Sequence, residues 1–121
     1  MSAIPKIIKA WCSNISVRNP ESQLSFYSDD AILLPTYDTI CVGSGAILDY
    51  FNDFLDKDEL ECNITKNYTQ YDIDRDILIA SGLYTFSFFE NGEYKKVDAR
   101  YTFVVAGNRI VNHHSSVEPL D

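Results

Sequence analysis

The stretch that decides the fold is residues 77–117, ILIASGLYTFSFFENGEYKKVDARYTFVVAGNRIVNHHSSV. Apolar and polar residues alternate through much of it, which is typical of β-strands with one buried face. Asn91-Gly92 and Gly107-Asn108 interrupt the alternation, and these residue types tolerate the positive φ angles of tight hairpin turns. The stretch therefore predicts three antiparallel strands. They are expected to cover about residues 77–89, 94–105 and 110–117.

Upstream of the hairpins, the spacing of apolar residues predicts three helices. Apolar residues recur every three or four positions between residues 4 and 15 and again between residues 47 and 55, so each segment has one apolar face. Ser44 is expected to cap the helix that carries the second segment. Between them, Asn19-Pro20-Glu21 is typical of a helix start, which predicts a short helix through about Tyr27.

Two further strands complete the expected order of elements. A short apolar strand is expected over residues 31–35, and a long, mostly polar strand over about residues 60–71. Helices followed by a strand meander predict an α+β fold, with the helices packed on one face of a curved, mostly antiparallel sheet. The 121 residues are expected to form a single domain over positions 1–121.

The composition is that of an acidic globular domain. Hydrophobic residues make up 45% of the chain, and 10 basic against 18 acidic residues give a formal net charge of −8. Nucleic acids and anionic membrane surfaces need clustered Lys and Arg, so neither is expected as a partner. Cys12, Cys41 and Cys62 are odd in number and form no metal pattern, which favours reduced thiols and a cytoplasmic location.

Three stretches of the chain resemble a known family. They are LSFYSDDAILLPT at 24–36, SGLYTF at 81–86, and Ala99–Phe103 followed by His113-His114-Ser115-Ser116 and Pro119. Together they resemble bacterial stand-alone relatives, of the SgcJ/EcaC type, of the association (hub) domain of calcium/calmodulin-dependent protein kinase II. This group lies within the SnoaL-like and nuclear transport factor two-like superfamily. The resemblance implies a cone-shaped α+β fold with the three helices on the concave face of the sheet, and a homodimer or larger homo-oligomer.

The strands also suggest a surface for self-association. Five aromatic residues alternate along two neighbouring predicted strands, so they share one face of the sheet. If the helices cover the other face, this aromatic face is exposed, and exposed patches of that size mark interfaces. The five residues are Tyr84, Phe86, Phe88, Tyr101 and Phe103.

Arg100 and one of two adjacent histidines are the candidate cations of the cone's cavity. Arg100 lies mid-strand among apolar residues, so it must reach the surface or be paired. It is either a fork for a ligand carboxylate or a structural partner of Asp49 or Asp98, and both roles can hold at once. His113 and His114 face opposite sides of a strand, so only one can line a cavity, and His114 is the expected one.

Two functions remain open. The first is a homo-oligomeric association or small-ligand-binding module whose cavity holds a small anion such as a carboxylate. The second is a SnoaL-like or ketosteroid isomerase-like enzyme that acts on a small hydrophobic carbonyl compound by proton transfer. An acid neutralised by Arg100 is a poor base at neutral pH, which favours the first. The predicted ligand-binding residues are Arg100, His114, Asp49, Tyr50 and Trp11.

The predicted pocket leads to one expectation about pH and one about metals and cofactors. With Arg100 and His114 both inside, an anion should bind more tightly at about pH 6 than at about pH 8, because the imidazole gains a charge. Adjacent histidines on a strand are not a metal pair, and Gly43-Ser44-Gly45 lacks the third glycine of a dinucleotide fingerprint. Neither a metal nor a cofactor is therefore expected.

Overall fold

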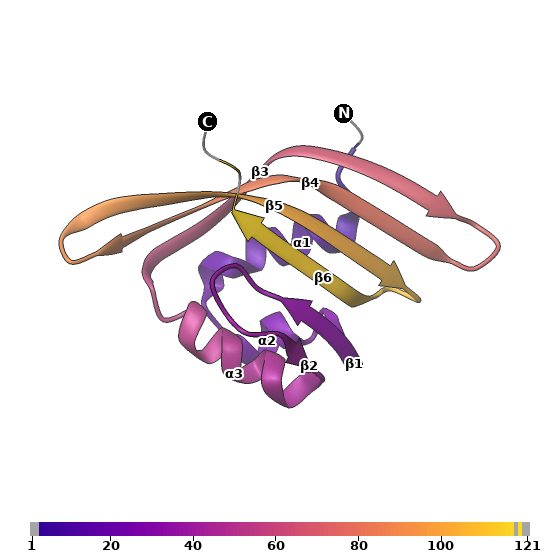
Figure 1. Ribbon diagram of the computed structural model, residues 1–121, viewed down its shortest axis with the longest axis horizontal. Coiled ribbons are helices and arrows are strands. Elements are labelled where there is room, and N and C mark those ends of the chain that lie inside the picture. The colour runs from indigo at the N-terminus through magenta and orange to yellow at the C-terminus, as the bar shows by residue number, and fades with distance from the viewer. Residues whose placement is uncertain (1–2, 118, 120–121) are drawn as a thin grey trace.

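The computed structural model describes residues 3–117 and 119, which form helices and one sheet (Figure 1). The helical elements are α1 (Lys6–Asn14), the 3-10 turn η1 (Ile15–Val17), α2 (Pro20–Leu24) and α3 (Ser44–Phe54). The strands are β1 (Tyr27–Leu34), β2 (Cys41–Val42), β3 (Asp58–Asp72), β4 (Ile77–Glu90), β5 (Glu93–Ala106) and β6 (Arg109–Val117). No helix among these residues is long and apolar enough to cross a membrane.

The strands form one curved, unclosed sheet in the order β2-β1-β6-β5-β4-β3. Neighbouring strands are antiparallel except β1 and β6, which pair in parallel after the chain has passed through α3 and the meander. The long β4–β5 ribbon arches over the helices, which all lie on one side of the sheet (Figure 1). The predicted α+β fold, a mostly antiparallel curved sheet with three helices on its concave face, is confirmed.

The core lies between the helices and the inner face of the sheet. From the helical side, Ile8 and Trp11 of α1 and Ile47 and Phe51 of α3 are buried, in line with the predicted apolar stripes. From the sheet, the predicted aromatic row is also buried here. The prediction that this row is an exposed association surface is therefore wrong. Alternation shows that the five residues share a face, but the helices cover that same face.

Several predicted boundaries also shift. The α2 helix ends at Leu24 rather than near Tyr27, because the carbonyl oxygen of Phe26 accepts the N–H of Ile110 and the chain joins the sheet there. Ser44 is the first residue of α3 rather than its cap. The preceding Gly43 has a φ of 85°, a conformation that suits glycine. The two-residue strand β2 is not predicted from the sequence at all.

Candidate functional site

A cavity of about 310 Å³ lies between the inner face of the sheet and helices α1 and α3. This volume is at the lower end of the range for small-molecule sites. The lining is mostly apolar, and its charged residues are Asp38, Asp53 and Lys57. The aromatic lining residues are Trp11, Tyr37, Tyr50, Phe51, Phe54, Tyr84, Phe86 and Phe88.

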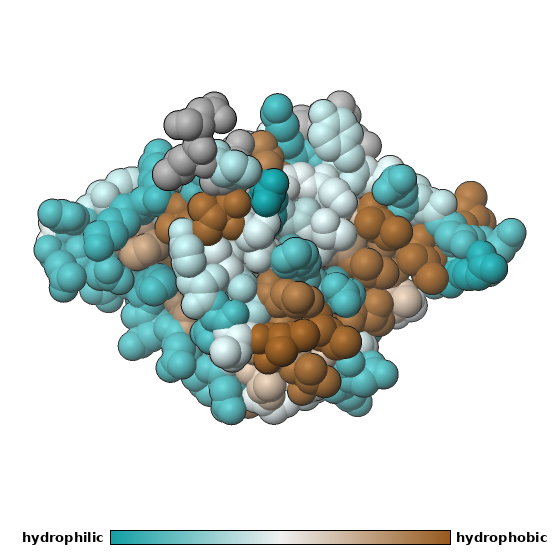
Figure 2. Space-filling view, viewed as in Figure 1, coloured by the Kyte–Doolittle hydropathy of each residue, from teal (hydrophilic) through white to brown (hydrophobic). Residues whose placement is uncertain are grey.

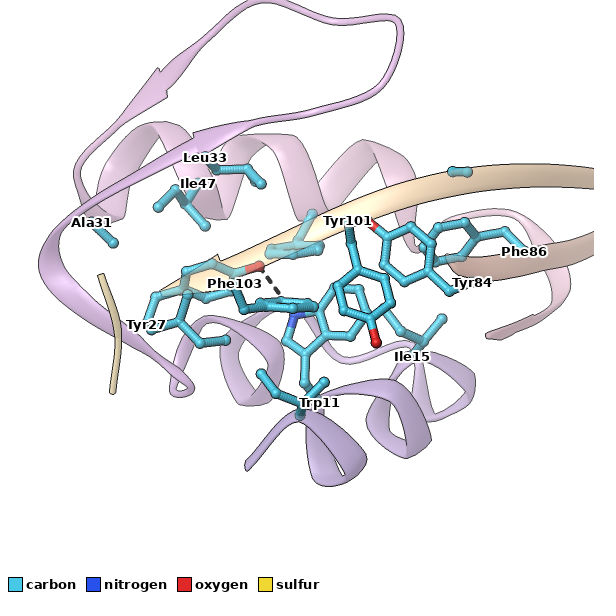
Figure 3. Close-up of a cluster of buried hydrophobic side chains, with 14 of the residues drawn as sticks. Trp11, Ile15, Tyr27, Ala31, Leu33, Ile47, Tyr84, Phe86, Tyr101 and Phe103 are labelled. Atoms are coloured by element: carbon cyan, nitrogen blue, oxygen red, sulfur yellow. Dashed lines mark hydrogen bonds between the residues drawn. The ribbon is translucent and has the colours of Figure 1, made fainter. Parts of the chain in front are cut away.

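Trp11, which α1 carries into the core, is the central wall of the cavity. Its ring stacks on Tyr84 with centroids 5.9 Å apart and meets Phe103 edge-on at 5.1 Å. The indole Nε1 donates to the hydroxyl of Tyr27 at 3.0 Å, the dashed line in Figure 3. The helical spacing of Ile8, Trp11 and Ile15 turns this side chain towards β4 and β5. Trp11 therefore has a fixed ring face and a satisfied N–H.

Behind this wall lies a buried imidazole with a tyrosine at each end. The hydroxyl oxygen of Tyr27 lies 2.8 Å from Nδ1 of His113, and that of Tyr84 lies 3.1 Å from Nε2. The His113 ring also stacks on Phe103, with centroids 3.9 Å apart. These contacts satisfy both ring nitrogens, as a buried polar side chain requires.

The hydrogen bonds continue from Tyr84 towards the cavity. The Tyr84 hydroxyl donates to Oγ of Ser115 at 2.7 Å, and that oxygen lies 2.7 Å from Oγ1 of Thr36. Since Tyr84 uses its own proton on Ser115, it must accept the Nε2 proton of His113. His113 then accepts from Tyr27 at Nδ1. The bonds thus run in one direction from Trp11 to Ser115, and either hydroxyl of the Ser115–Thr36 pair can be the donor.

Every titratable member of this hydrogen-bonded chain is neutral at physiological pH. Burial lowers the pKa of His113 to about 3, with the charge of His114 as a smaller cause. Burial likewise raises the pKa of Tyr27 and Tyr84 well above the usual value for tyrosine. This series of hydrogen bonds can therefore orient hydroxyl groups in the cavity, but it places no charge there.

The charged lining residues stand where the cavity meets solvent. Asp38 and Asp53 are exposed, and the ammonium of Lys57 lies 5.0 Å from the centroid of the Phe88 ring. Tyr50 packs against Phe51 and Phe54, and its pKa is raised by burial and further by the negative charge of Asp38. The opening thus carries two carboxylates against one ammonium.

Comparisons with known proteins place this geometry in a family. No family model and no curated protein matches the chain. Among solved structures, a candidate calcium/calmodulin-dependent protein kinase II association domain from Xanthomonas campestris is 30% identical, with a TM-score of 0.87. The match covers 99% of this chain and 95% of that one. The chain belongs to the association-domain family.

More distant structures share the fold of this association-domain protein. A protein of ketosteroid isomerase-like fold from Catenulispora acidiphila, in complex with trimethylamine, is 16% identical, with a TM-score of 0.74 over 93% of this chain and 85% of that one. A candidate polyketide cyclase from Xanthomonas campestris is 11% identical, with a TM-score of 0.67 over 93% and 87%. At these identities the likeness concerns the fold alone.

In this member of the association-domain family, the structure corrects the predicted placement of Arg100 and His114. Both lie on the outer face of the sheet, away from the cavity, and Nε of Arg100 donates to Oγ of Ser116 at 3.3 Å. The reason is the strand alternation, since Ala99 and Tyr101 point towards the helices and Arg100 between them cannot. The predicted preference for an anion and its pH dependence lose their basis in this cavity.

The alternative structural role predicted for Arg100 is not seen either. Asp49 is exposed on α3 and does not line the cavity, and Asp98 accepts a hydrogen bond from Thr85. Among the residues that the structure describes, no salt bridge involves Arg100. The guanidinium reaches the surface instead, which is the other of the two ways expected for an arginine in an apolar strand.

Trp11 and Tyr50 do line the cavity, and their role towards a ligand stays a prediction. Sequence reasoning missed the groups behind them. The histidine inside is His113 rather than His114, and no sequence pattern singled out Thr36 or Ser115. The sequence shows only that His113 and Ser115 share a strand face, and it does not show that this face is the inner one.

Proposed function

We propose that this protein is a self-associating, small-ligand-binding module whose cavity takes a small, mostly apolar, uncharged molecule with one hydrogen-bonding group. One observation carries the proposal: the cavity has an aromatic wall, and the neutral hydrogen-bonded chain ends in it at Ser115 and Thr36. The wall fits apolar ligand surface, and a hydroxyl of this pair can donate to a ligand oxygen or accept from a ligand donor.

The charge at the opening argues against an anionic ligand. A carboxylate that enters the cavity would lose its hydration, and no arginine lines the cavity to pair with it. It would also have to pass the negative charges of Asp38 and Asp53. Lys57 offers one positive charge, but its ammonium already lies over the Phe88 ring. A neutral carbonyl or hydroxyl compound avoids this cost.

The only tryptophan of the chain reports on binding, because Trp11 lines the cavity. Its fluorescence should change on titration with acetophenone, which combines an aromatic ring and a carbonyl. Ethylbenzene lacks the acceptor and benzoate carries a charge, so each should bind at least about tenfold more weakly, a difference of about 1.4 kcal/mol. Trimethylamine, the compound in the Catenulispora complex, is a fourth probe. If benzoate or trimethylamine binds most tightly, the proposal that the cavity takes an uncharged ligand is wrong.

Self-association is supported by an apolar area at the β1–β2 edge of the sheet. Val42 is 64% exposed and Ile40 59% exposed, and Val42 pairs with Ile32 of β1, next to Leu34. Figure 2 shows apolar residues gathered over this part of the molecule. We call Ile32, Leu34, Ile40 and Val42 the apolar edge patch, and contiguous exposed apolar area of this kind marks contact surfaces.

Light scattering tests the assembly. The native chain should give the mass of a dimer or a larger oligomer at micromolar concentration. Replacing both Ile40 and Val42 by Ser should lower that mass to one chain. The control is Ile73→Ser, which removes an exposed apolar side chain from a turn far from the patch. A one-chain mass for the native protein would contradict self-association.

Proton transfer to or from a small carbonyl compound is the second candidate function. One observation favours it: the Asp38 carboxylate and the Tyr50 hydroxyl line the same apolar cavity, as a base and an oxyanion donor would. Exchange of α-hydrogens of cyclic ketones for deuterium, followed by NMR, tests this activity. Exchange that is catalysed by the native protein and abolished by Asp38→Asn would support an enzyme. Exchange no faster than in buffer alone would contradict the enzyme and favour the binding module.

A further inference from the structure

We propose that Cys12 and Cys62 form a redox-active dithiol pair that a peroxide oxidises to an intramolecular disulfide. The site lies outside the ligand cavity and is independent of the proposed function. Cys12 belongs to α1 and Cys62 to β3, so the cysteines are far apart in sequence, and the contact between helix and sheet brings them together.

The geometry places the two thiols against each other. Sγ of Cys12 donates to the carbonyl oxygen of Cys62 at 3.2 Å, so the first sulfur lies at the backbone of the second cysteine. Each thiol also shifts the pKa of the other, in agreement with this contact. A disulfide needs neighbouring backbones whose side chains point together, and the Cys12 sulfur already lies beside the backbone of Cys62.

Both cysteines are partly exposed at the surface. Cys12 and Cys62 are half-buried free thiols, and they line the same surface pocket together with polar residues such as Ser13, Asn63 and Lys96. The third cysteine, Cys41, is buried in β2 and lies in another part of the molecule. The chain therefore holds one pair and one isolated thiol, which serves as an internal control.

The surroundings give the two thiols different roles. The hydrogen bond from the Cys62 thiol lowers the pKa of Cys12 against the effect of burial, and a backbone hydrogen bond at Ile64 acts in the same direction. The pKa of Cys62 is raised because a hydrogen bond to Cys12 stabilises the protonated Cys62 thiol and because the Cys62 side chain is buried. Burial and the charges of Asp38 and Asp49 raise the pKa of Cys41. Cys12 is thus the nucleophile and Cys62 the resolving thiol.

The reaction balances with hydrogen peroxide as the oxidant. The Cys12 thiolate attacks one peroxide oxygen, the O–O bond breaks, and the leaving hydroxide takes up a proton to become water. This leaves a sulfenic acid on Cys12. The sulfur of Cys62 then loses its proton and attacks the sulfur of Cys12; the S–O bond breaks and a second water leaves. The two thiols lose two electrons, and the peroxide gains them.

The disulfide would tie α1 to β3 one residue away from Trp11, which lines the cavity. Trp11 precedes Cys12 in α1, so the helix that supplies the central wall would be linked covalently to the sheet. The amplitude of the Trp11 fluorescence change with acetophenone, measured before and after oxidation, reports any effect on the cavity. Formation of the disulfide is measured separately and does not depend on ligand binding.

Peptide mapping by mass spectrometry tests the proposal. The reduced native protein is treated with a small excess of hydrogen peroxide, remaining thiols are alkylated, and the chain is digested. The expected result is a Cys12–Cys62 linked peptide, a loss of two hydrogen atoms from the intact mass, and alkylated Cys41. Oxidation at Cys12 should be at least about tenfold faster than at Cys41, since less of the Cys41 thiol is ionised.

Three variants sharpen the test. Cys41→Ser should form the disulfide as the native chain does. Cys62→Ser should stop at a sulfenic acid on Cys12, which dimedone traps, and Cys12→Ser should form neither product. Circular dichroism checks that each variant is folded. A linked peptide that appears only in urea, a linkage between two chains, or equal oxidation of Cys12 and Cys41 would overturn the proposal.

Discussion

The inner and outer faces of the same three strands, β4, β5 and β6, have opposite chemistry. His113 is 2% exposed, touches two tyrosines and stays neutral, whereas His114 beside it is exposed on the outer face with Arg100. Ser115 and Ser116 differ in the same way, since one joins the buried hydrogen-bonded chain and the other meets Arg100. A shift of one residue along a strand thus moves a side chain between the buried inner face and solvent.

The largest expected effect comes from an inner–outer pair on β5. Phe103 is fully buried against Trp11 and His113, so Phe103→Ala should lower the free energy of unfolding by about 3–5 kcal/mol. Thr102→Ala, on the outer face, should cost less than about 1 kcal/mol. Urea unfolding followed by circular dichroism gives both values. Equal losses would break the contrast between the faces.

His113 and His114 should contribute differently to the pH dependence of the free energy of unfolding. The pKa of His113 is about 3 in the folded protein and about 6.5 when unfolded. Its stabilising contribution is therefore complete above about pH 6.5 and is lost as pH falls towards 3. Between about pH 6.5 and pH 5, the free energy of unfolding should drop by about 2 kcal/mol from this group.

Variants of each histidine show which side chain causes this drop in the free energy of unfolding. His113→Gln should remove this part of the pH dependence, because the variant has no imidazole to protonate on unfolding. His114→Gln should retain it, since that side chain is exposed. Urea unfolding at a series of pH values gives the slopes. If the pH dependence disappears in His114→Gln instead, the drop comes from His114 and the contrast between the two histidines is wrong.

The serine pair should show a difference of similar size. Ser115→Ala leaves the Tyr84 hydroxyl without its acceptor and Thr36 without its partner, at a cost of about 1–3 kcal/mol. It should also weaken acetophenone binding if the ligand contacts this hydroxyl pair. Ser116→Ala should change stability by no more than about 0.5 kcal/mol. Thermal unfolding and the Trp11 titration measure the two effects.

The smallest effect is expected at Arg100. Its guanidinium is exposed and bonded to one serine hydroxyl, so Arg100→Ala should change the free energy of unfolding by about 0.5 kcal/mol or less. The affinity for a cavity ligand should be unchanged, because Arg100 lies on the outer face. Calorimetric titration with acetophenone checks this. A clear loss of affinity would mean that ligands bind on the outer face.

The fold was predictable because local patterns carry it. The change of hydrophobic period near residue 60, the turn pairs at Asn91-Gly92 and Gly107-Asn108, and the start signal at Asn19 all agree with the observed elements. Tyr27 was assigned to the wrong element because its place is set by a contact with β6, distant in sequence. Propensity gives way to such tertiary pairing at the ends of elements.

The candidate site was predictable only in part. Trp11 and Tyr50 were found because they lie on the apolar faces of helices, and such faces turn inward. The sequence by itself determined which strand residues share a face: Arg100 with Thr102, and His113 with Ser115. Only the tertiary structure decided which of those faces the helices cover. A period of two is the same whichever side is buried, and the choice depends on contacts between helix and sheet that are distant in sequence.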